Sequence, residues 1–390
     1  MAYLETHPWL AFALNLKTLP YKGWLLLGEC ACRCEHMAGA PLRPATAAHM
    51  HKVYLAKGVM ATTAIEGNTL SEKEVMDRIE GKGNVPPSKQ YLAQEVDNII
   101  KECNLILERA TTNSLEKITP ERLCDINRIV LEKLDLPEEI KPGRYRAHRV
   151  TVGKYRAPLP QDVPALARKL CAFLEEFDAT PGLPAMAVGI LKSALAHLYI
   201  AWIHPFGDGN GRTARLVEYE LLLQCGIPSV SAHLLSNHYN QTRTEYYRHL
   251  DESSRSANPI SFILYALQGF VDGLEQQSDV IRQEQLDIAW RNYVHESFKT
   301  HKTNVGNRRR HLVLDISRNE QGVTLEEIQS LTPRLAQWYA RKTTKTLVRD
   351  LNAVIKMDLV QKKGKTYRAK RELILAFLPL RIQCRASVSK

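Results

Sequence analysis

The chain contains no uninterrupted apolar stretch as long as a membrane-spanning helix, which needs roughly 18 residues or more. Its first residues also lack the basic region, apolar segment and small-residue cleavage site of a secretory signal. We therefore expect a cytoplasmic protein with no membrane partner. What is present is a chain of 390 residues, 44% of them hydrophobic, which suffices for buried cores in two or three domains.

Paired cysteine motifs of the zinc-binding kind are also missing, although the sequence has eight cysteines. Five are scattered singly through segments with a helical pattern, as buried thiols would be. The other three, Cys30, Cys32 and Cys34, lie close to His36, but their alternate spacing differs from the usual zinc patterns. Chance clustering is the simpler interpretation, and a metal site at this cluster stays open.

Negative charge is scarce only at the C-terminal end. Residues 301–390 contain 20 Lys and Arg against seven Asp and Glu, a net charge of +13, whereas residues 1–300 have a net charge of −2. The basic character of the chain, +11 in total, therefore belongs to one terminal module. The partner that this charge attracts should be sought there.

The most informative stretch covers residues 204–215, between two apolar helical segments, and reads His-Pro-Phe-Gly-Asp-Gly-Asn-Gly-Arg-Thr-Ala-Arg. Gly209, Asn210 and Gly211 leave room for their backbone N–H groups to converge on phosphate oxygens. We expect a helix to begin at about Arg212, so that the positive end of its dipole points at the same oxygens. The stretch is therefore predicted to bind phosphate groups.

Four charged or ionisable side chains complete this stretch. Arg212 and Arg215 lie three positions apart, on one face of the expected helix, where both can bind phosphate oxygens. Asp208 supplies a hard oxygen ligand for Mg²⁺, and His204, with an ordinary pKa of about 6.5, can accept a hydroxyl proton. The alternative is a glycine-rich loop whose charges only solvate its rim. Such a loop has no need of these residue types at fixed spacing.

The same residues resemble the Fic family signature His-x-Phe-x-Asp/Glu-Gly-Asn-Gly-Arg-x-x-Arg at every specified position. The resemblance implies a mainly α-helical bundle with a small β-hairpin flap. It also implies an enzyme that transfers AMP from ATP, with Mg²⁺, to a Ser, Thr or Tyr hydroxyl of a target protein. His204 would be the catalytic base and Asp208 the metal ligand. The nucleotide contacts implied are Asp208, Gly209, Asn210, Gly211, Arg212, Thr213, Arg215 and Tyr246.

Tyr246 comes from residues 233–252, which correspond to the family segment that lines the adenine pocket. A second adenine contact found in some relatives is an Asn, and Ser254 stands at that position here. His197 lies seven residues before His204 on roughly the same helical face, where it would assist the base or, more simply, be a hydrogen-bonded core histidine.

An upstream pattern, Thr-Thr-Ala-Ile-Glu-Gly at residues 62–67, ends a predicted helix and is similar to the Fic inhibitory pattern Ser/Thr-x-x-x-Glu-Gly/Asn. The resemblance implies an inhibitory helix of about residues 46–67, with Thr62 and Glu66 as its inhibitory residues and Glu66 paired with Arg215. A carboxylate there takes the guanidinium that the γ-phosphate needs and repels the triphosphate. An exposed charge at a helix end is the plainer alternative.

A predicted strand pair, with a strand at Tyr145–Val152 and a turn at Gly153-Lys154, resembles the Fic flap, which holds the target segment as an added strand. Such main-chain pairing does not name the target, and an ordinary surface hairpin is the alternative. The flap and target-binding residues implied are Val150, Thr151, Val152 and Gly153.

The basic C-terminal module has three helical patterns followed by a two-strand ribbon with a lysine-rich turn at residues 362–365. This order is similar to a winged helix-turn-helix, which can place its third helix in a DNA major groove and its wing along phosphates. The same scaffold serves as a docking or dimer surface in multi-domain Fic-like proteins. DNA contact through residues 301–390 and a homodimer therefore both stay open.

Together these patterns predict a mainly α protein with an irregular N-terminal extension at residues 1–45, a Fic-type catalytic domain at 46–300 and a winged-helix-like domain at 301–390. The predicted function is an autoinhibited protein adenylyltransferase. Two alternatives remain. Glu66 would direct a water that removes AMP at the same site, or the chain would be a DNA-binding regulator whose Fic domain senses nucleotide.

Overall fold

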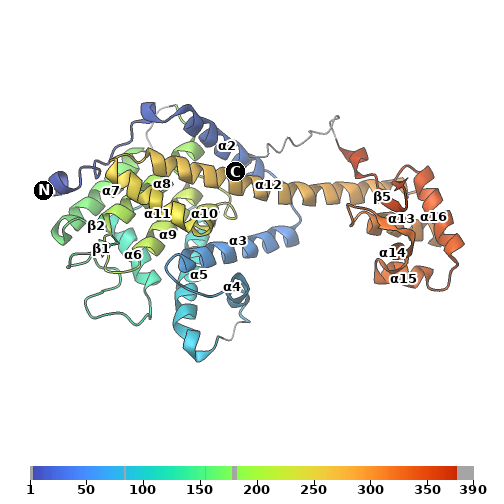
Figure 1. Ribbon diagram of the computed structural model, residues 1–390, viewed down its shortest axis with the longest axis horizontal. Coiled ribbons are helices and arrows are strands. Elements are labelled where there is room, and N and C mark those ends of the chain that lie inside the picture. Colours follow the sequence, from blue (N-terminus) through green and yellow to red (C-terminus); the bar gives the residue numbers. More distant parts are fainter. Residues whose placement is uncertain (1–2, 83–84, 154, 178–181, 376–390) are drawn as a thin grey trace. The chain divides into compact units, whose positions relative to one another are not determined.

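The structure is a computed structural model that describes residues 3–82, 85–153, 155–177 and 182–375. The chain divides into two compact units, Met1–Ile281 and Arg282–Lys390 (Figure 1). The division falls inside one long helix, whereas the sequence analysis placed the domain boundary at residue 300.

The N-terminal segment belongs to the core of the larger unit. It forms α1 (Tyr3–Thr6), a 3-10 turn at Leu16–Thr18 and α2 (Tyr21–Ala38). Leu27, Cys30 and Cys34 of α2 are buried in the main hydrophobic cluster. The expectation of an irregular segment was wrong here, because these apolar residues recur at helical spacing. Cys32 is exposed on the other side, and no metal-binding cluster occurs among the described residues.

Four helices follow: α3 (Pro44–Ala64), α4 (Glu72–Ile79), α5 (Gln90–Thr111, after a 3-10 turn at Pro87–Lys89) and α6 (Pro120–Val130). α3, α5 and α6 contribute side chains or backbone groups to the candidate active site. Capping residues explain two of the starts. Ser71 and Glu74 form a capping box at α4, and the Thr119 hydroxyl accepts the first-turn N–H of α6. After α3, Gly67 takes a φ of +102°, which turns the chain sharply.

A short antiparallel hairpin comes next. β1 (Thr151–Val152) pairs with β2 (Tyr155–Arg156), and the turn residue Lys154 lies outside the described residues. The expectation of a strand from Tyr145 onward was wrong. Tyr145 makes only an isolated bridge to Phe206, because the backbone and side chain of Arg146 donate to carbonyls of residues 204–205.

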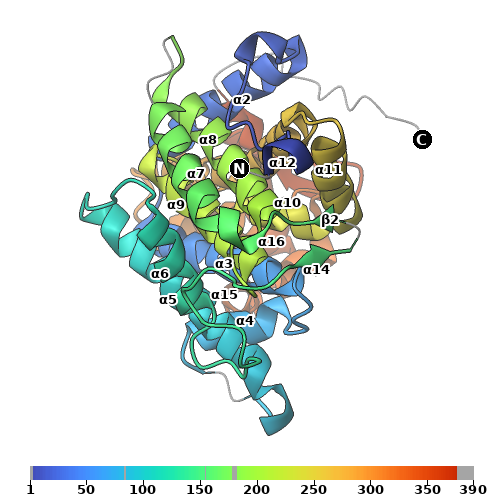
Figure 2. The same cartoon turned by 90° about the vertical axis from the view of Figure 1, so that its left-hand side faces the viewer.

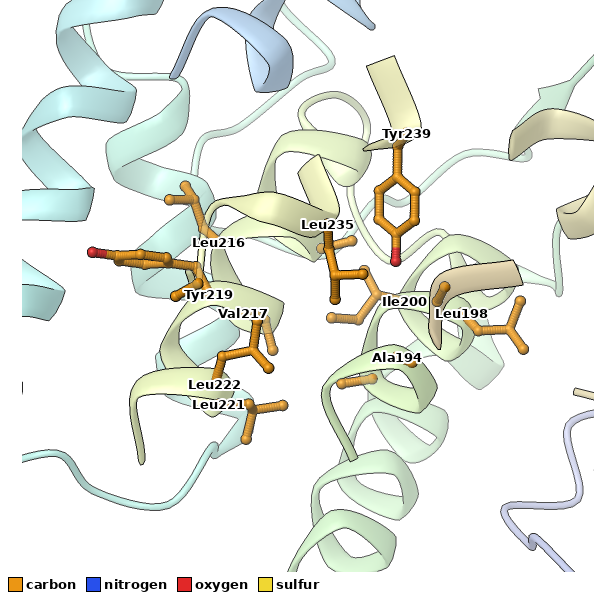
Figure 3. Close-up of a cluster of buried hydrophobic side chains, with 14 of the residues drawn as sticks. Ala194, Leu198, Ile200, Leu216, Val217, Tyr219, Leu221, Leu222, Leu235 and Tyr239 are labelled. Carbon is orange, nitrogen blue, oxygen red and sulfur yellow. The ribbon is translucent and has the colours of Figure 1, made fainter. Parts of the chain in front are cut away.

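The centre of the larger unit is α8 (Ala185–Ile203), which packs against α2, α7 (Val163–Phe177, after a 3-10 turn at Pro160–Asp162) and α9 (Asn210–Gln224) (Figure 2). Figure 3 shows Ile200 of α8 beside Leu235 in a cluster of buried hydrophobic side chains. By length and composition α8 would suffice to cross a membrane, contrary to the expectation that no segment would. Because 89% of its apolar window is buried in this core, we regard it as a core helix.

The larger unit ends with α10 (Leu234–Gln241), α11 (Arg243–Arg255) and the first part of α12 (Ile260–Ser297). Leu235 and Tyr239 of α10 pack into the cluster of Figure 3. Helix α10 also contacts α3 and α11.

The smaller unit has its own hydrophobic cluster. After α12, its elements are α13 (Asn304–Ile316), β3 (Val323–Thr324), α14 (Leu325–Ser330), α15 (Pro333–Tyr339), α16 (Thr344–Lys356), β4 (Val360–Lys363), β5 (Thr366–Ala369) and a 3-10 turn at Arg371–Ile374. The strands form an antiparallel sheet in the order β3-β5-β4. The two-strand ribbon was predicted at the correct residues, whereas β3 and α15 were not predicted.

Candidate active site

His204 lies at the point where α8 stops. It adopts a left-handed backbone conformation (φ 49°, ψ 61°) that ends the helix, and its N–H still donates to the Ile200 carbonyl at 2.9 Å. Burial lowers the pKa of the imidazole to about 4, and the positive charge of Arg146 acts in the same direction. Hydrogen bonding to the backbone of Ala201 and the charges of Glu66 and Asp208 oppose this shift only in part. The ring is therefore neutral at physiological pH and able to accept a proton.

Arg146 is a residue that the sequence analysis did not assign to the site. Its buried guanidinium donates to the His204 carbonyl at 2.7 Å, the His148 carbonyl at 2.9 Å and the Pro158 carbonyl at 2.7 Å. It thereby joins the loop after α8 to the segments on both sides of the hairpin. Arg146 lies within the flap strand predicted at Tyr145–Val152, and nothing in that pattern indicates a bond to the His204 carbonyl.

Side-chain amides fix the backbone of the loop before α9 by hydrogen bonds. The Asn210 side-chain amide makes two hydrogen bonds to the backbone of Phe206. Its oxygen accepts from the Phe206 N–H and its nitrogen donates to the Phe206 carbonyl, each at 2.9 Å. Asn127 of α6 donates to the Asp208 carbonyl at 2.9 Å. Gly209 has a φ of +75° and lies so close to Asn127 that a Cβ there would stand 3.1 Å from its Nδ2. The backbone at the start of α9 is therefore preorganised.

Thr213 is fully buried one turn into α9 and lies 3.4 Å from the Asn127 amide. Its hydroxyl therefore faces the protein interior, and its predicted nucleotide contact would have to come from the backbone. α9 itself begins at Asn210, slightly before the expected start at Arg212.

Arg215 and Glu66 form an ion pair in which Nη2 of the arginine lies 2.6 Å from Oε1 of the glutamate. The same nitrogen donates to the Thr62 carbonyl at 2.9 Å. The arginine side chain is 1% exposed and the glutamate side chain 34%. Burial disfavours both charges, but their attraction holds the pKa of Glu66 below its usual value and raises that of Arg215. Both groups are therefore charged at neutral pH.

The Glu66 carboxylate stands directly over the first turn of α9. A Cβ on Gly211 would lie 2.2 Å from Glu66 Oε1 and 3.2 Å from Arg215 Nη1. Nε and Nη1 of Arg215 are buried and have no hydrogen-bond partner among the described residues. Unsatisfied donors of this kind are costly, so the site would gain from an anion that brings more acceptor oxygens than one carboxylate.

A second carboxylate, Glu95 of α5, holds the other arginine. Nη1 of Arg212 lies 2.8 Å from Glu95 Oε1, and Nη2 lies 3.3 Å from Asp208 Oδ1. Asn68, which follows the Glu66 turn, donates to Glu95 Oε2 and to the Leu92 carbonyl, each at 2.9 Å. Asn68 and Glu95 are not predictable as site residues from the sequence, because only the fold brings them to the motif.

The donor set fits the group that the resemblance implies. Asp208 is partly exposed, and no cluster of three or more His, Cys, Asp or Glu side chains that could hold a metal occurs in the described part of the chain. A single carboxylate suits Mg²⁺, which commonly takes its remaining ligands from phosphates and water. Asp208 would hold that ion, and the two guanidiniums and the start of α9 would hold the phosphates.

Tyr246, the predicted purine contact, is 3% exposed and packs in the core. Its hydroxyl lies 2.9 Å from His197 Nε2, and its ring stacks on Tyr239 at 4.9 Å. This places His197 in the core, as the simpler interpretation had it. The neighbouring Tyr247 is 45% exposed and its hydroxyl lies 3.5 Å from the Ile65 carbonyl, so it is the more accessible ring beside the Glu66 turn.

The predicted flap residues 150–153 lie on and next to the hairpin. Thr151 and Val152 are exposed, the Val150 carbonyl accepts from the Ala157 N–H at 3.2 Å, and Gly153 has a φ of +58°. The sheet has only two strands, so each strand has one edge without a strand partner among the described residues.

Comparisons with known proteins bear on this geometry. Residues 117–222 match the Fic/DOC family. Protein adenylyltransferase Fic from Nematostella vectensis is 32% identical over 196 residues, which cover 50% of this chain and 42% of that protein. Protein adenylyltransferase fic-1 from Caenorhabditis elegans is 29% identical over 198 residues, covering 49% of this chain and 35% of the relative. The matches thus span less than half the length of these relatives.

Two solved structures are similar in fold. A Fic family protein from Desulfovibrio desulfuricans superposes with a TM-score of 0.55 at 20% identity, covering 90% of this chain and 97% of that one. A Fic-1 fragment from C. elegans superposes with a TM-score of 0.55 at 21% identity, covering 67% of this chain and 73% of the fragment. The predicted mainly α, Fic-like fold with a small hairpin is confirmed, and so is the distant homology to protein adenylyltransferases. Glu66 and the smaller unit lie outside the matched family segment.

Proposed function

We propose that this chain, which carries a Fic/DOC family domain over residues 117–222, transfers AMP from ATP to a hydroxyl group of a protein. The observation that carries the proposal is the anion site at the start of α9. There the Nε and Nη1 atoms of Arg215 are buried without hydrogen-bond partners among the described residues, a carboxylate already occupies the position of an anion, and the neutral imidazole of His204 lies in the same loop.

The chemistry needs one base and one anion cradle. His204 accepts the proton of a target Ser, Thr or Tyr hydroxyl while the oxygen forms a bond to the α-phosphorus of ATP. The bond between the α-phosphorus and the oxygen bridging to the β-phosphate breaks, and pyrophosphate leaves. Arg212, Arg215 and the N–H groups of residues 209–211 bind the phosphates. Mg²⁺ at Asp208 would supply further neutralisation of the phosphate charge. Most of the rate comes from positioning and electrostatics.

We further propose that the chain is autoinhibited. A phosphate and the Glu66 carboxylate compete for the same guanidinium, and two negative groups at one arginine repel each other. Glu95 has the equivalent position on Arg212, and Asn68 joins it to the turn that carries Glu66. Displacing that turn would therefore loosen both carboxylates.

The hairpin β1–β2 is the proposed docking edge for the target. A strand edge next to the site can accept an extended segment by main-chain hydrogen bonds, which depend little on its sequence. The target segment would then lie with its hydroxyl towards His204.

The decisive experiment uses Glu66→Gly protein with α-³²P-labelled ATP, Mg²⁺ and a whole-cell extract, with mass spectrometry of labelled bands. Losing a charge-assisted hydrogen bond of about 1.5–3 kcal/mol predicts AMP incorporation roughly 10–150-fold above the unsubstituted chain. AMP incorporation should also rise in Glu66→Gln, which keeps the shape of the side chain and removes its charge.

Glu116→Gly is the matched control, because Glu116 is an exposed loop carboxylate with no ion pair among the described residues. It should leave incorporation unchanged. If neither Glu66 variant incorporates label while both remain folded and bind ATP, the transferase proposal is wrong.

A second activity at the same site follows from the position of Glu66. Its carboxylate is one-third exposed and acts electrostatically on His204, so it lies where it can orient a water towards a modified hydroxyl. The site would then also remove AMP from an adenylylated protein. In that reaction the water oxygen would form a bond to the phosphorus of the attached AMP and the bond from phosphorus to the side-chain oxygen would break. The proton lost by the water would end on the side-chain oxygen, so that AMP and the free hydroxyl are released. Release of free AMP that disappears in Glu66→Gly distinguishes this activity from inhibition alone.

A further inference from the structure

The basic side chains of the smaller unit are concentrated in α16 and the β4–β5 hairpin. Residues 341–370 contain ten Lys and Arg against two Asp. Both carboxylates are engaged internally. Asp350 is fully buried and accepts from Arg308 at 2.7 Å and Arg309 at 2.9 Å, and Asp358 pairs with Lys370 at 2.6 Å. The Asp358 side chain is 65% exposed, so this part of the unit has one surface carboxylate and is otherwise cationic.

Helix α16 has two opposite faces. Leu347, Leu351 and Val354 are buried in the core of the unit. Lys345, Arg349, Asn352 and Lys356 are all exposed and follow each other at intervals of four, three and four residues, which places them in one stripe along the helix. Lys345, Arg349 and Lys356 have no ion pair in the described part of the chain. A shallow hollow beside the stripe is lined by Lys345, Val348, Arg349 and Asn352.

The hairpin adds a second cationic element. Its two-residue turn, Gly364-Lys365, connects β4 to β5, and Lys363 pairs across from Thr366. Lys362, Lys363 and Lys365 are exposed, and a Cβ on Gly364 would meet nothing within 4 Å. The tip therefore projects freely from the unit. Because α16 packs on β4, the helix stripe and the hairpin belong to one continuous region.

We propose that α16 and the β4–β5 hairpin form a binding surface for double-stranded DNA, with the exposed stripe in the major groove and the lysine tip along adjacent phosphates. The major groove of DNA admits one helix, and Arg and Asn are the side chains that bind guanine and adenine edges there. The hairpin lysines then bind phosphate without regard to sequence. The major groove of A-form RNA is deep and too narrow to admit a helix, so double-stranded DNA is the partner that fits this surface.

The test measures binding of the full chain to a fluorescein-labelled mixed-sequence 30-base-pair DNA by fluorescence anisotropy, at several salt concentrations and without ATP. We expect non-specific binding at about 10⁻⁶–10⁻⁴ M at physiological salt. The variant Lys362→Glu, Lys363→Glu, Lys365→Glu should bind at least tenfold more weakly. Its slope of log affinity against log salt should fall by about 2–3, or about 0.9 for each lost phosphate contact.

The matched control is Lys17→Glu, Lys22→Glu, Lys73→Glu, which changes the net charge equally at three exposed positions of the larger unit. It should retain the affinity and salt slope of the unsubstituted chain. Equal loss in both triple variants would overturn the proposal, because binding would then follow net charge alone. Where the reversed variant unfolds, the three alanine substitutions at the same lysines replace it.

Arg349→Ala with Asn352→Ala tests the helix stripe. Selection from a random-sequence DNA pool should lose its consensus in this variant while the salt slope stays close to that of the unsubstituted chain. Tighter binding to an RNA duplex or to phosphatidylserine vesicles than to DNA would also overturn the proposal. None of these measurements depends on AMP transfer, so a failure here is separate from a failure of the proposed enzyme activity.

Discussion

Two groups of cationic side chains in this molecule differ in almost every physical respect. At the start of α9, Arg212 and Arg215 are buried and each is held by a carboxylate. On the β4–β5 hairpin, Lys362, Lys363 and Lys365 are exposed and have no ion pair among the described residues. The first arrangement is a preorganised anion site that the chain itself occupies, and the second is an open surface for a polyanion.

The difference follows from desolvation. A buried guanidinium cannot remain without a counter-charge, so the fold must supply one or a ligand must bring it. An exposed lysine is solvated by water, and an internal partner would add little stability. Internal regulation by competition is therefore expected at the buried site, whereas the exposed surface should respond to salt.

The largest expected effect tests the chemistry of the buried site. In a Glu66→Gly background, His204→Ala should lower the initial rate of AMP transfer by about 10²–10⁴-fold, because a positioned general base contributes that much. ATP affinity measured by calorimetry should change little. Transfer at the parent rate would show that the imidazole is not the base.

The buried arginines and the exposed lysines should differ in how strongly salt affects their function. Between 50 and 200 mM salt, a surface that neutralises three phosphates loses about 40-fold in DNA affinity. The transfer rate of Glu66→Gly at saturating ATP should change far less over that range, because buried ion pairs are poorly screened. A rate that falls as steeply as DNA binding would mean that the site near Arg215 is not desolvated.

A smaller effect is expected at Glu95. Glu95→Gln should raise transfer by about 2–5-fold, since Arg212 keeps Asp208 as a second partner and the lost pair is partly solvated. In the Glu66→Gly background the gain should shrink, because Asn68 bonds Glu95 to the turn that carries Glu66. Fully additive gains, measured as initial rates in a double-mutant cycle, would contradict this coupling.

The pH dependence is the subtlest test. With the pKa of His204 lowered to about 4, the base is neutral above that pH and becomes protonated only as the pH falls through it. Removing Glu66 takes away a negative charge that favours protonation, so the pKa should not rise in Glu66→Gly. The kcat/KM of that variant should show no inflection near pH 6.5. An inflection there would indicate an imidazole in ordinary solvent.

The sequence predicted the helices that depend on local signals. α7 and α8 coincide with apolar segments of helical length, and Ser71 and Thr119 cap α4 and α6 where hydroxyls precede helical segments. The 204–215 stretch could be recognised because its residues are contiguous. Its predicted roles for nucleotide, metal and target stay predictions that the experiments above address.

What the sequence could not predict depends on contacts between distant segments. Glu95 and Arg146 reach the site from 117 and 58 residues away, and no local pattern marks them. The strand expected from Tyr145 does not form. The Arg146 side chain donates to the His204, His148 and Pro158 carbonyls, and this holds the chain in a different path from a strand ladder. Tyr246 and Tyr247 are adjacent in sequence, and only the fold decides which ring is buried.

The central claim is that Glu66 and the triphosphate compete for Arg215. It is tested most directly by measuring initial rates of AMP transfer for the unsubstituted chain, Glu66→Gly, Arg215→Ala and the double variant. The account predicts that Glu66→Gly activates strongly when Arg215 is present and has almost no effect when it is replaced. Equal activation in both backgrounds would show that Glu66 inhibits by some route other than this guanidinium.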